Sequence, residues 1–387
     1  MISLLIFLLV LSALVLGHEC GHYIAARICG VKAEEFGYGF PPRAIGFVRS
    51  KGRWKRVDAK DQRSYPGTIW SINWLPLGGF VRLKGEEGGT GGEKDSFLSK
   101  SVFARIFILV AGVAMNWFMA ASIFIFGFLI GVPAQLDGLP SDAIITDRQV
   151  QIVEVLAGSA AEKGKLETGD FILQVDTVPV QDDVTAQQKI AEDAIKGKTI
   201  DLQILRKKEL RHVSIQAEYI ESLERPGLGV KLASTGIVRF SLPSAIGQGV
   251  TVTWGYTKLI VSSLGQLVGD LFVRQKVSEG LSGPVGIAVL TSRIAEQGVW
   301  SVMQFAALLS INLAVINILP IPALDGGRIF FILLESVRRR RSNALFEATV
   351  HRIGFVLLLG LIFLVTIHDV RQYGGVIWQG LKQAVGM

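Results

Sequence analysis

Apolar segments long enough to cross a bilayer are the feature that most limits how this chain can fold. Half of its 387 residues are hydrophobic, and long apolar segments occupy 2–28, 102–132 and 300–319, with a shorter one at 353–367. A membrane-spanning helix needs about 20 apolar residues, and in lipid a helix pairs all of its own backbone groups. The expected fold class is therefore a multi-pass α-helical membrane protein with four transmembrane helices.

The first apolar segment has an alternative interpretation as a cleaved signal peptide. Such a peptide begins with positive charge and ends at a cleavage site of small residues. Here no Lys or Arg precedes Arg27, and the apolar run continues through the motif HECGH to Ala25 and Ala26. We therefore expect a retained spanning helix.

The charges of the loops predict an orientation. Lys and Arg are abundant between the first two apolar segments, and the four arginines from Arg338 to Arg341 lie between the last two. Cytoplasmic loops carry an excess of basic residues, so both loops are expected inside the cell, with the termini and the more acidic middle region outside. The net charge of +7 then reflects membrane orientation and anchoring, and nucleic-acid binding is not expected.

The chain is expected to divide into eight regions. In order, these are a first transmembrane helix with the motif HExxH (1–30), a cytoplasmic membrane-associated β region (31–100), a second transmembrane helix (101–133), an extracytoplasmic domain (134–235), an amphipathic interfacial region (236–298), a third transmembrane helix with the motif LDG (299–335), a basic cytoplasmic loop (336–352), and a fourth transmembrane helix with a C-terminal tail (353–387).

The β region contains alternating apolar residues at 72–83, around Gly78 and Gly79, which predict a hairpin. Apolar strands beside a spanning helix suggest a sheet at the bilayer edge, where irregular backbone is allowed if it is buried in protein or lines a cavity. The glycine-rich stretch 85–94 is expected to be a flexible connector.

The segment 245–273 is apolar but is interrupted by Gln248, Lys258 and Asp270. If it spanned the membrane, the helix ends that carry the candidate metal ligands would fall on opposite sides. We therefore expect an amphipathic helix at the outer interface.

The middle domain has the pattern of a PDZ domain. Strands are expected at 151–156, 170–180 and 199–207, with a helix at 186–195 between the last two. The segment 158–170 resembles the turn and short helix of PDZ domains, and Leu228, Gly229 and Val230 resemble their peptide-binding loop. PDZ domains bind an extended peptide as an added strand. The alternative is a β-rich spacer without a ligand.

His18, Glu19 and His22 form the pattern HExxH inside the first apolar helix. Residues four apart share a helix face, so both imidazoles can bind one zinc ion while Glu19 lies beside the metal-bound water. Ionisable groups are costly in an apolar helix and are usually functional there.

A zinc hydrolase needs three protein ligands and one open position. Ala25 stands where the pattern HExxHxxGxxH requires glycine, so the third ligand must come from elsewhere. Asp325 is the best candidate, because Pro320 and Pro322 end the preceding helix at the membrane face that carries the histidines. The alternative is that Asp325 only caps the next helix. Other candidate ligands are His351, His368 and Asp369, the last two at the outer end of the fourth helix.

Together, HECGH and the motif Asn317-x-x-Pro320-x-Pro322-x-Leu324-Asp325-Gly326 resemble the site-2 protease family of intramembrane zinc metalloproteases. The bacterial branch that includes the regulator of sigma-E protease is most similar, through the segments GYGF, WLPLGGFVRLKGE, AGVAMNW and SGPVGIA. The resemblance implies that Asp325 is the third zinc ligand, that Asn317, Pro320 and Pro322 help to position substrate, and that the hairpin clamps an extended substrate segment. Branch members often carry two PDZ domains, whereas this chain has room for one.

The resemblance implies a zinc-dependent endopeptidase of the bacterial inner membrane, which cleaves transmembrane segments of single-pass proteins near the cytoplasmic face. Expected partners are the lipid bilayer, an anti-sigma factor of a stress response or a signal-peptide remnant as substrate, and a site-1 protease that cuts the substrate first. The alternatives are a catalytically inactive PDZ-bearing membrane scaffold and a metal transporter. The intact set of ligands at one membrane face disfavours both.

Overall fold

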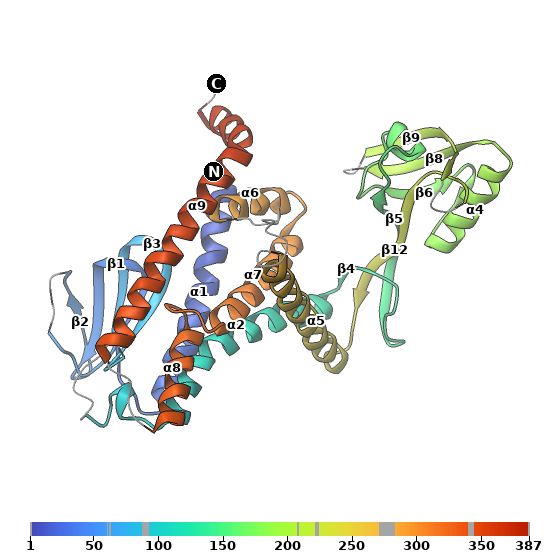
Figure 1. Ribbon diagram of the computed structural model, residues 1–387. Helices are drawn as coiled ribbons and strands as arrows, with labels where there is room; N and C mark the ends of the chain where they lie inside the picture. Colours follow the sequence, from blue (N-terminus) through green and yellow to red (C-terminus); the bar gives the residue numbers. More distant parts are fainter. Residues whose placement is uncertain are drawn as a thin grey trace. The chain divides into compact units, whose positions relative to one another are not determined.

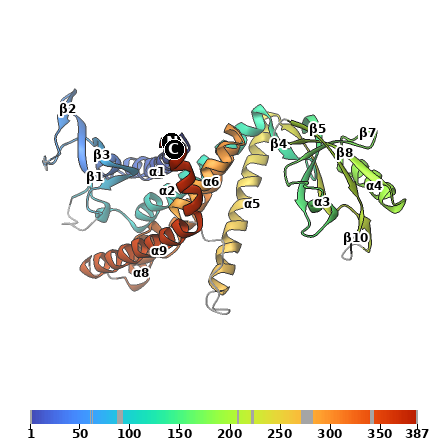
Figure 2. The same cartoon turned by 90° about the horizontal axis from the view of Figure 1, so that it is seen from above.

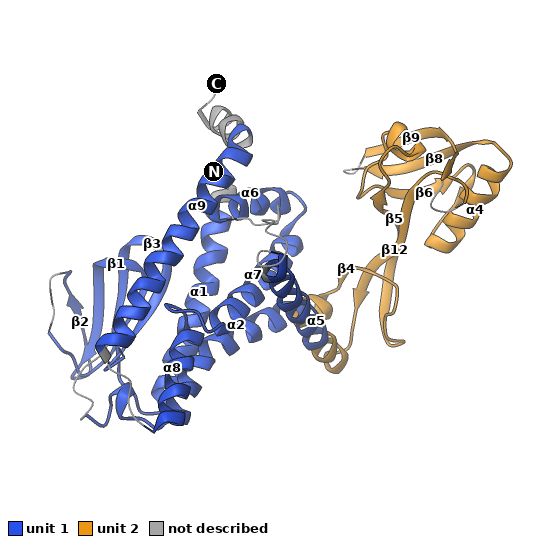
Figure 3. Cartoon of the chain, viewed as in Figure 1, with its two compact units in different colours: residues 1–124, 249–387 blue, residues 125–248 orange. Residues whose placement is uncertain are grey.

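The computed structural model describes residues 2–59, 61, 63–86, 93–206, 209–220, 224–270, 283–339 and 344–385. The chain forms two compact units, which are described separately (Figure 3). The membrane unit consists of residues 1–124 and 249–387, and the PDZ-like unit consists of residues 125–248.

Four helices among the described residues are long and apolar enough to cross a membrane. They are α1 (Ile2–Ile28), α2 (Val102–Ile130), α7 (Val299–Ile318) and α9 (Ala344–Val385) (Figure 1). The first three begin and end close to the predicted segments. The fourth helix is much longer than the predicted 353–367, because no proline follows to stop it and helical geometry continues beyond His368 and Asp369.

The outer surfaces of these helices are apolar. On α9, for example, Leu357, Phe363 and Leu364 are 68%, 66% and 65% exposed. So large a contiguous apolar surface is unusual on a water-soluble protein and fits contact with lipid.

Outside the PDZ-like sheet domain, three further helices are α5 (Leu242–Gly269), α6 (Pro284–Ala295) and α8 (Asp325–Arg338). A single 3₁₀ turn, η1 (Phe97–Ser99), precedes α2. Helix α5 confirms helical structure in the predicted segment 245–273, of which 271–273 lie outside the described residues, and α5 is not among the four candidate spans. Most of the predicted connector, 87–92, and two of the four clustered arginines, Arg340 and Arg341, also lie outside them.

The sheet of the membrane unit contains β1 (Ala33–Ser50), β2 (Arg53–Val57) and β3 (Ile69–Leu83), in the antiparallel order β2-β1-β3. The predicted hairpin at 72–83 is wrong in its pairing. Tyr38 of β1 is paired with both Ile72 and Gly79, so the first part of β1, residues 35–38, lies between the two arms of β3. Gly78, with φ of +74°, allows the chain to bend between these arms. The arms do not pair with each other, because a strand lies between them.

The second arm of β3, residues 79–83, forms an edge of this sheet and lies against α1 (Figures 1 and 2). Beneath it, a buried cluster joins the end of α1 to the sheet, α2 and α8. Its members are Ala25, Ala26, Val31, Ala33, Leu83, Phe97, Ile108, Leu109 and Ile332. Because burial of apolar area is the main source of stability, this cluster fixes the end of α1 against the edge arm.

The PDZ-like unit is built on one sheet of order β4-β12-β5-β6-β8-β9, with β7 paired to β6. Its strands are β4 (Val132–Gln135), β5 (Ile144–Val155), β6 (Phe171–Val175), β7 (Val178–Pro179), β8 (Thr199–Arg206), β9 (Glu209–Gln216) and β12 (Val230–Arg239), with a separate pair β10 (Glu218–Ile220) and β11 (Arg225–Gly227). Its helices are α3 (Ala160–Lys163) and α4 (Asp183–Ile195). The predicted strands, short helix and longer helix are confirmed, and β4, β9, β10, β11 and β12 were not predicted.

Candidate active site

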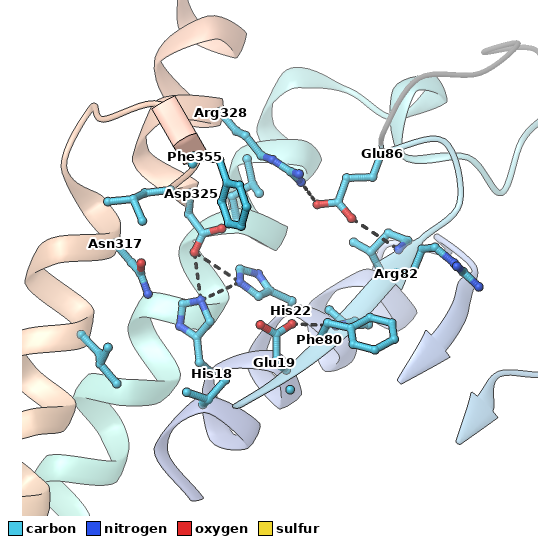
Figure 4. A pocket seen from close by; sticks show the side chains of 18 of the residues that line it. His18, Glu19, His22, Phe80, Arg82, Glu86, Asn317, Asp325, Arg328 and Phe355 are labelled. Atoms are coloured by element: carbon cyan, nitrogen blue, oxygen red, sulfur yellow. Dashed lines mark hydrogen bonds and ion pairs between the residues drawn. The ribbon is translucent and has the colours of Figure 1, made fainter. Parts of the chain in front are cut away.

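The two histidines of HExxH and the distant Asp325 meet at one point. His18 Nε2 lies 3.0 Å from His22 Nε2, and Asp325 Oδ2 lies 3.0 Å from the first and 3.3 Å from the second. Figure 4 shows the three side chains turned toward one another. The spacing on α1 explains the histidine pair, and the fold brings the distant Asp325 to it, as a resemblance of motifs had implied.

Asp325 is the first residue of α8, and the cap residue before it is Leu324. No side-chain hydrogen bond caps this helix, so capping does not account for the aspartate. Glycines follow it because α8 begins against the end of α7: a Cβ at Gly326 or Gly327 would overlap the backbone of Ile318 or Ile321. The close turn thereby presents the carboxylate to α1.

Helix α2 orients both imidazoles. His22 Nδ1 lies 2.9 Å from the carbonyl oxygen of Ile108, which can only accept, so Nδ1 carries the proton and Nε2 keeps a lone pair. His18 Nδ1 lies 3.4 Å from the side-chain amide of Asn116, whose buried oxygen has no hydrogen-bond partner among the described residues. If this amide is rotated by half a turn, its oxygen lies at His18 Nδ1 and accepts a hydrogen bond from it. Nδ1 then carries the proton, and Nε2 of His18 keeps a lone pair, as in His22.

Gly112 of α2 makes room for the histidines. A Cβ at this position would lie 2.9 Å from His18 Cε1 and would overlap His22 Nε2, and one at Gly21 would overlap the backbone of Ala111. Gly112 and Asn116 were not predicted as site residues. The available signal was an asparagine one helical turn after a glycine within an apolar helix, since small and amide residues mark close helix contacts in membranes.

These residues fit a zinc ion. The three ligand atoms lie within 4.8 Å of one another, His18 and His22 are buried, and Asp325 Oδ2 is a buried oxygen without a hydrogen-bond donor among the described groups. Two neutral imidazoles and one carboxylate are a ligand set found in zinc hydrolases, where a fourth position stays open. An uncompensated cluster of this kind would be costly to bury, and a cation would offset that cost.

Glu19 lies beside this cluster and is held by the edge arm of β3. Its Oε2 accepts a hydrogen bond of 2.8 Å from the backbone N–H of Val81. Val81 is paired with Phe36 of β1 on the other side of the arm. The general base expected from the sequence therefore contacts the strand edge that faces the pocket.

The pocket around the site has a volume of about 650 Å³ and is lined by α1, α2, α7, α8, α9 and the edge arm (Figure 4). Of the three predicted substrate-positioning residues, Asn317 lines it, whereas Pro320 and Pro322 lie in the turn before α8 and are not part of the lining. Of the alternative ligands, His351 lines the pocket, outside the ligand cluster.

Asp369 is engaged elsewhere. Its buried carboxylate accepts hydrogen bonds from the backbone N–H groups of Gly283 and Gly286, at 3.2 and 2.7 Å, at the start of α6. It therefore joins α9 to α6, and neither Asp369 nor the adjacent His368 lines the catalytic pocket.

Two charged groups lie at the rim of the pocket. Arg328, one turn after Asp325 on α8, forms an ion pair with Glu86, which follows the edge arm. Burial lowers the pKa of the Arg328 guanidinium from its ordinary value, while nearby Glu347 and Glu19 oppose that shift. Arginine stays protonated even so, which places a fixed positive charge beside the pocket.

In the PDZ-like unit, Leu228, Gly229 and Val230 line a groove of about 410 Å³ together with residues of α4. Gly229 has a φ of +79°, and its carbonyl accepts a hydrogen bond from Leu156 N–H at 2.9 Å. Strand β12 pairs with β5 along one edge, whereas β4 pairs with its other edge only at Thr235 and beyond. The start of β12 thus has an unpaired edge over the groove, within the described strands.

The pattern of peptidase family M50 matches residues 6–57 and 60–361. The chain belongs to this family, the site-2 proteases, and is a zinc metalloprotease and an integral membrane protein. Zinc metalloprotease RasP of Geobacillus kaustophilus is 28% identical over 449 residues, covering 96% of this chain and 98% of that protein.

The regulator of sigma-W protease RasP of Bacillus subtilis is also 28% identical, over 451 residues, with 96% of this chain and 98% of that protein covered. Among solved structures, the PDZ domain of the SdrC-like protein from Listeria monocytogenes is 20% identical, covering 23% of this chain and 92% of that chain with a TM-score of 0.21.

Proposed function

We propose that this protease cleaves peptide bonds inside transmembrane segments, with zinc held by His18, His22 and Asp325. The observation that carries the proposal is the meeting of these ligand atoms within 4.8 Å, with both histidines on α1, itself a candidate membrane span, and Asp325 on α8, which follows the candidate span α7. A site placed there can reach peptide bonds that soluble proteases cannot, because the substrate segment is itself buried in lipid.

Zinc, when bound, would supply the Lewis acid that makes a water molecule nucleophilic near neutral pH. Glu19 takes the proton of the attacking water and then gives it to the leaving amine nitrogen. The hydrogen bond from Val81 N–H orients the Glu19 carboxylate for both transfers. Glu19 is half-buried and lines the pocket, so its carboxylate can reach a water molecule bound there.

The substrate is bound as an extended strand at the edge arm 79–83. A helical substrate has its peptide bonds paired and shielded, so it must unwind before attack, and strand addition supplies new backbone partners. The arm lines the pocket beside Glu19 and pairs with β1 on its other edge only, which supports this role. Asn317 contacts the unwound segment, and Pro320 and Pro322 shape the turn that supports it.

The substrates are single-pass membrane proteins of a bacterial inner membrane, either membrane-bound anti-sigma factors that act in a stress response or signal-peptide remnants. The name of the Bacillus subtilis relative, regulator of sigma-W protease, supports the first class. A site-1 protease removes the outer part of the substrate first. The active site lies near the cytoplasmic face and the PDZ-like unit outside, where its groove binds a peptide or excludes bulky ectodomains.

Glu19→Gln tests the proposal, because it removes the base and keeps a side chain of similar size. The variant should keep its fold and about one zinc ion per chain, yet fail to cleave a single-span reporter in proteoliposomes. Retained cleavage would refute the role of Glu19. His18→Ala should lose both zinc and cleavage, and an inactive scaffold would show neither difference. The Glu19→Gln protein can also trap substrates in cells for mass spectrometry.

A further inference from the structure

The turn that carries Asp325 contains a residue in an unfavourable backbone conformation. Ala323 has a φ of +78°, a region that residues with a Cβ rarely adopt. A conformation of this kind persists only where its surroundings hold it in place.

His351 of α9 holds this residue. The backbone N–H of Ala323 lies 2.9 Å from His351 Nδ1, and an amide N–H can only donate, so Nδ1 accepts and the neutral ring carries its proton on Nε2. Nε2 is buried and has no hydrogen-bond partner among the described residues. The Ala323 amide is thus the hydrogen-bond partner that the described structure gives to this imidazole.

A second contact places α9 against the same turn. Gly354 lies one turn beyond His351, and a Cβ there would come within 2.9 Å of the Pro322 carbonyl oxygen and 3.0 Å of its carbonyl carbon. Helix α9 therefore contacts two successive residues of the turn, through the side chain of His351 and the bare backbone of Gly354. The turn ends two residues later at Asp325.

We propose that His351 is a positioning residue for the zinc ligand Asp325. By accepting from the Ala323 amide, it keeps the turn in the conformation that directs the Asp325 carboxylate toward His18 and His22. Without this acceptor, Ala323 would relax toward negative φ and the carboxylate would move off the histidines. The inference rests on the proposed role of Asp325 as a ligand.

The test is the zinc affinity of the purified full-length chain, measured by competition with a chelator and independent of proteolysis. His351→Leu removes the acceptor and should weaken zinc binding about 10-fold or more, as loss of groups that orient metal ligands does. His351→Asn places an amide oxygen near the position of Nδ1 and should retain most of the affinity. Equal affinities of the Leu and Asn variants with the unsubstituted chain would overturn the proposal.

A second substitution separates positioning from general damage to α9. Glycine adopts positive φ without strain, so Ala323→Gly should restore part of the zinc affinity lost in His351→Leu. A packing defect caused by leucine would persist in the double variant, and that result would also overturn the proposal. Gly354→Ala, which keeps His351 but presses on Pro322, should weaken zinc binding even if the His351 variants fold poorly.

Asp325→Ala distinguishes this inference from the proposed function. If Asp325→Ala loses zinc while His351→Leu keeps full affinity, only the positioning role fails. If Asp325→Ala itself binds zinc as tightly as the unsubstituted chain, the proposed ligand set fails with it.

Discussion

Two of the strand edges in the described part of the chain border a pocket or a groove, and the groups around these two edges differ. The edge arm 79–83 of β3 lies beside Glu19 and the buried cluster of His18, His22 and Asp325. The start of β12 borders a groove whose described lining includes apolar residues of α4 and β11 and contains no comparable metal-ligand cluster. We propose that both edges bind an extended peptide through its backbone, and that the groups beside the first edge hydrolyse it. Strand addition would thus bind a peptide at either edge, and the neighbouring side chains would determine whether the bound peptide is cleaved.

The largest difference between the two strand edges is the proposed metal-ligand cluster beside the edge arm of β3. Asp325→Asn replaces a charged ligand by a neutral amide and should lower cleavage of a single-span substrate by at least about 10³-fold, since the metal supplies several kcal/mol of transition-state stabilisation. Cleavage can be measured in proteoliposomes by gel assay. Chelation of the unsubstituted protein should give the same loss, reversed by added zinc, whereas added zinc should not rescue the variant. Residual activity near the unsubstituted rate would remove Asp325 from the site.

The catalytic edge depends on one backbone donor. Val81→Pro deletes the N–H that holds Glu19 and should reduce cleavage on the order of 10²-fold, because preorganised donors at reacting groups have effects of that size. Val81→Ala keeps the N–H and is the matched control, expected to stay close to the unsubstituted rate. If both variants lose activity equally, the valine side chain matters and the amide does not.

The edge of β12 should instead affect which peptides the protein binds. Ala191→Trp fills the groove beside Gly229 and should weaken binding of a peptide there about 10-fold, as measured by fluorescence polarisation, with a smaller effect on hydrolysis of a short single-span substrate. Gln188→Trp, on the exposed surface of α4 and outside the groove lining, is the matched control. A large loss of hydrolysis from Ala191→Trp alone would mean that the groove takes part in the reaction.

The smallest effect concerns the stability of the catalytic edge. Buried Glu35 accepts hydrogen bonds from Arg43 and from Arg82 of the edge arm. Burial alone would raise the pKa of the Glu35 carboxyl, but the bonds from Arg43 and Ser71 and the nearby arginine charges hold it below its ordinary value of 4.5. The resulting stabilisation is fully present above pH 4.5 and is lost as the pH falls through the lowered folded-state pKa.

Unfolding of the full chain and of Glu35→Gln, followed from neutral pH down to pH 3, tests this linkage. The unsubstituted chain should be the more stable at neutral pH, and the two should converge on acidification. If the difference in the free energy of unfolding between the two proteins stays constant over this pH range, Glu35 stabilises the fold through its packing and not through its charge.

Local patterns in the sequence predicted what depends on local structure. The apolar length of α1, α2 and α7 gave their bounds, and the spacing of His18 and His22 gave their shared face. The position of α9 was predicted, but its extent was not, because hydropathy marks where a helix is apolar and not where it ends.

Features set by tertiary contacts were harder to predict. The apolar alternation at 72–83 was correct for strands, yet the partner of both arms is β1, and strand pairing is not encoded in alternation. Asn116 and Gly112 were missed because their role depends on which face of α2 meets α1. Asp325 could be selected as a candidate because Pro320 and Pro322 end the preceding helix at the predicted membrane face of the histidines, but its contact with His18 and His22 is set by the tertiary fold.

The bare backbone of Gly112 has a consequence for how this chain can vary. The imidazoles of both histidines occupy the space where any larger side chain would begin, so even one added methyl group must displace a proposed zinc ligand. In a library of all twenty amino acids at this position, selection for proteolysis should return glycine alone. Other residues of the α1–α2 contact can be substituted one at a time. At residue 112, any substitution also requires α1 and α2 to move apart.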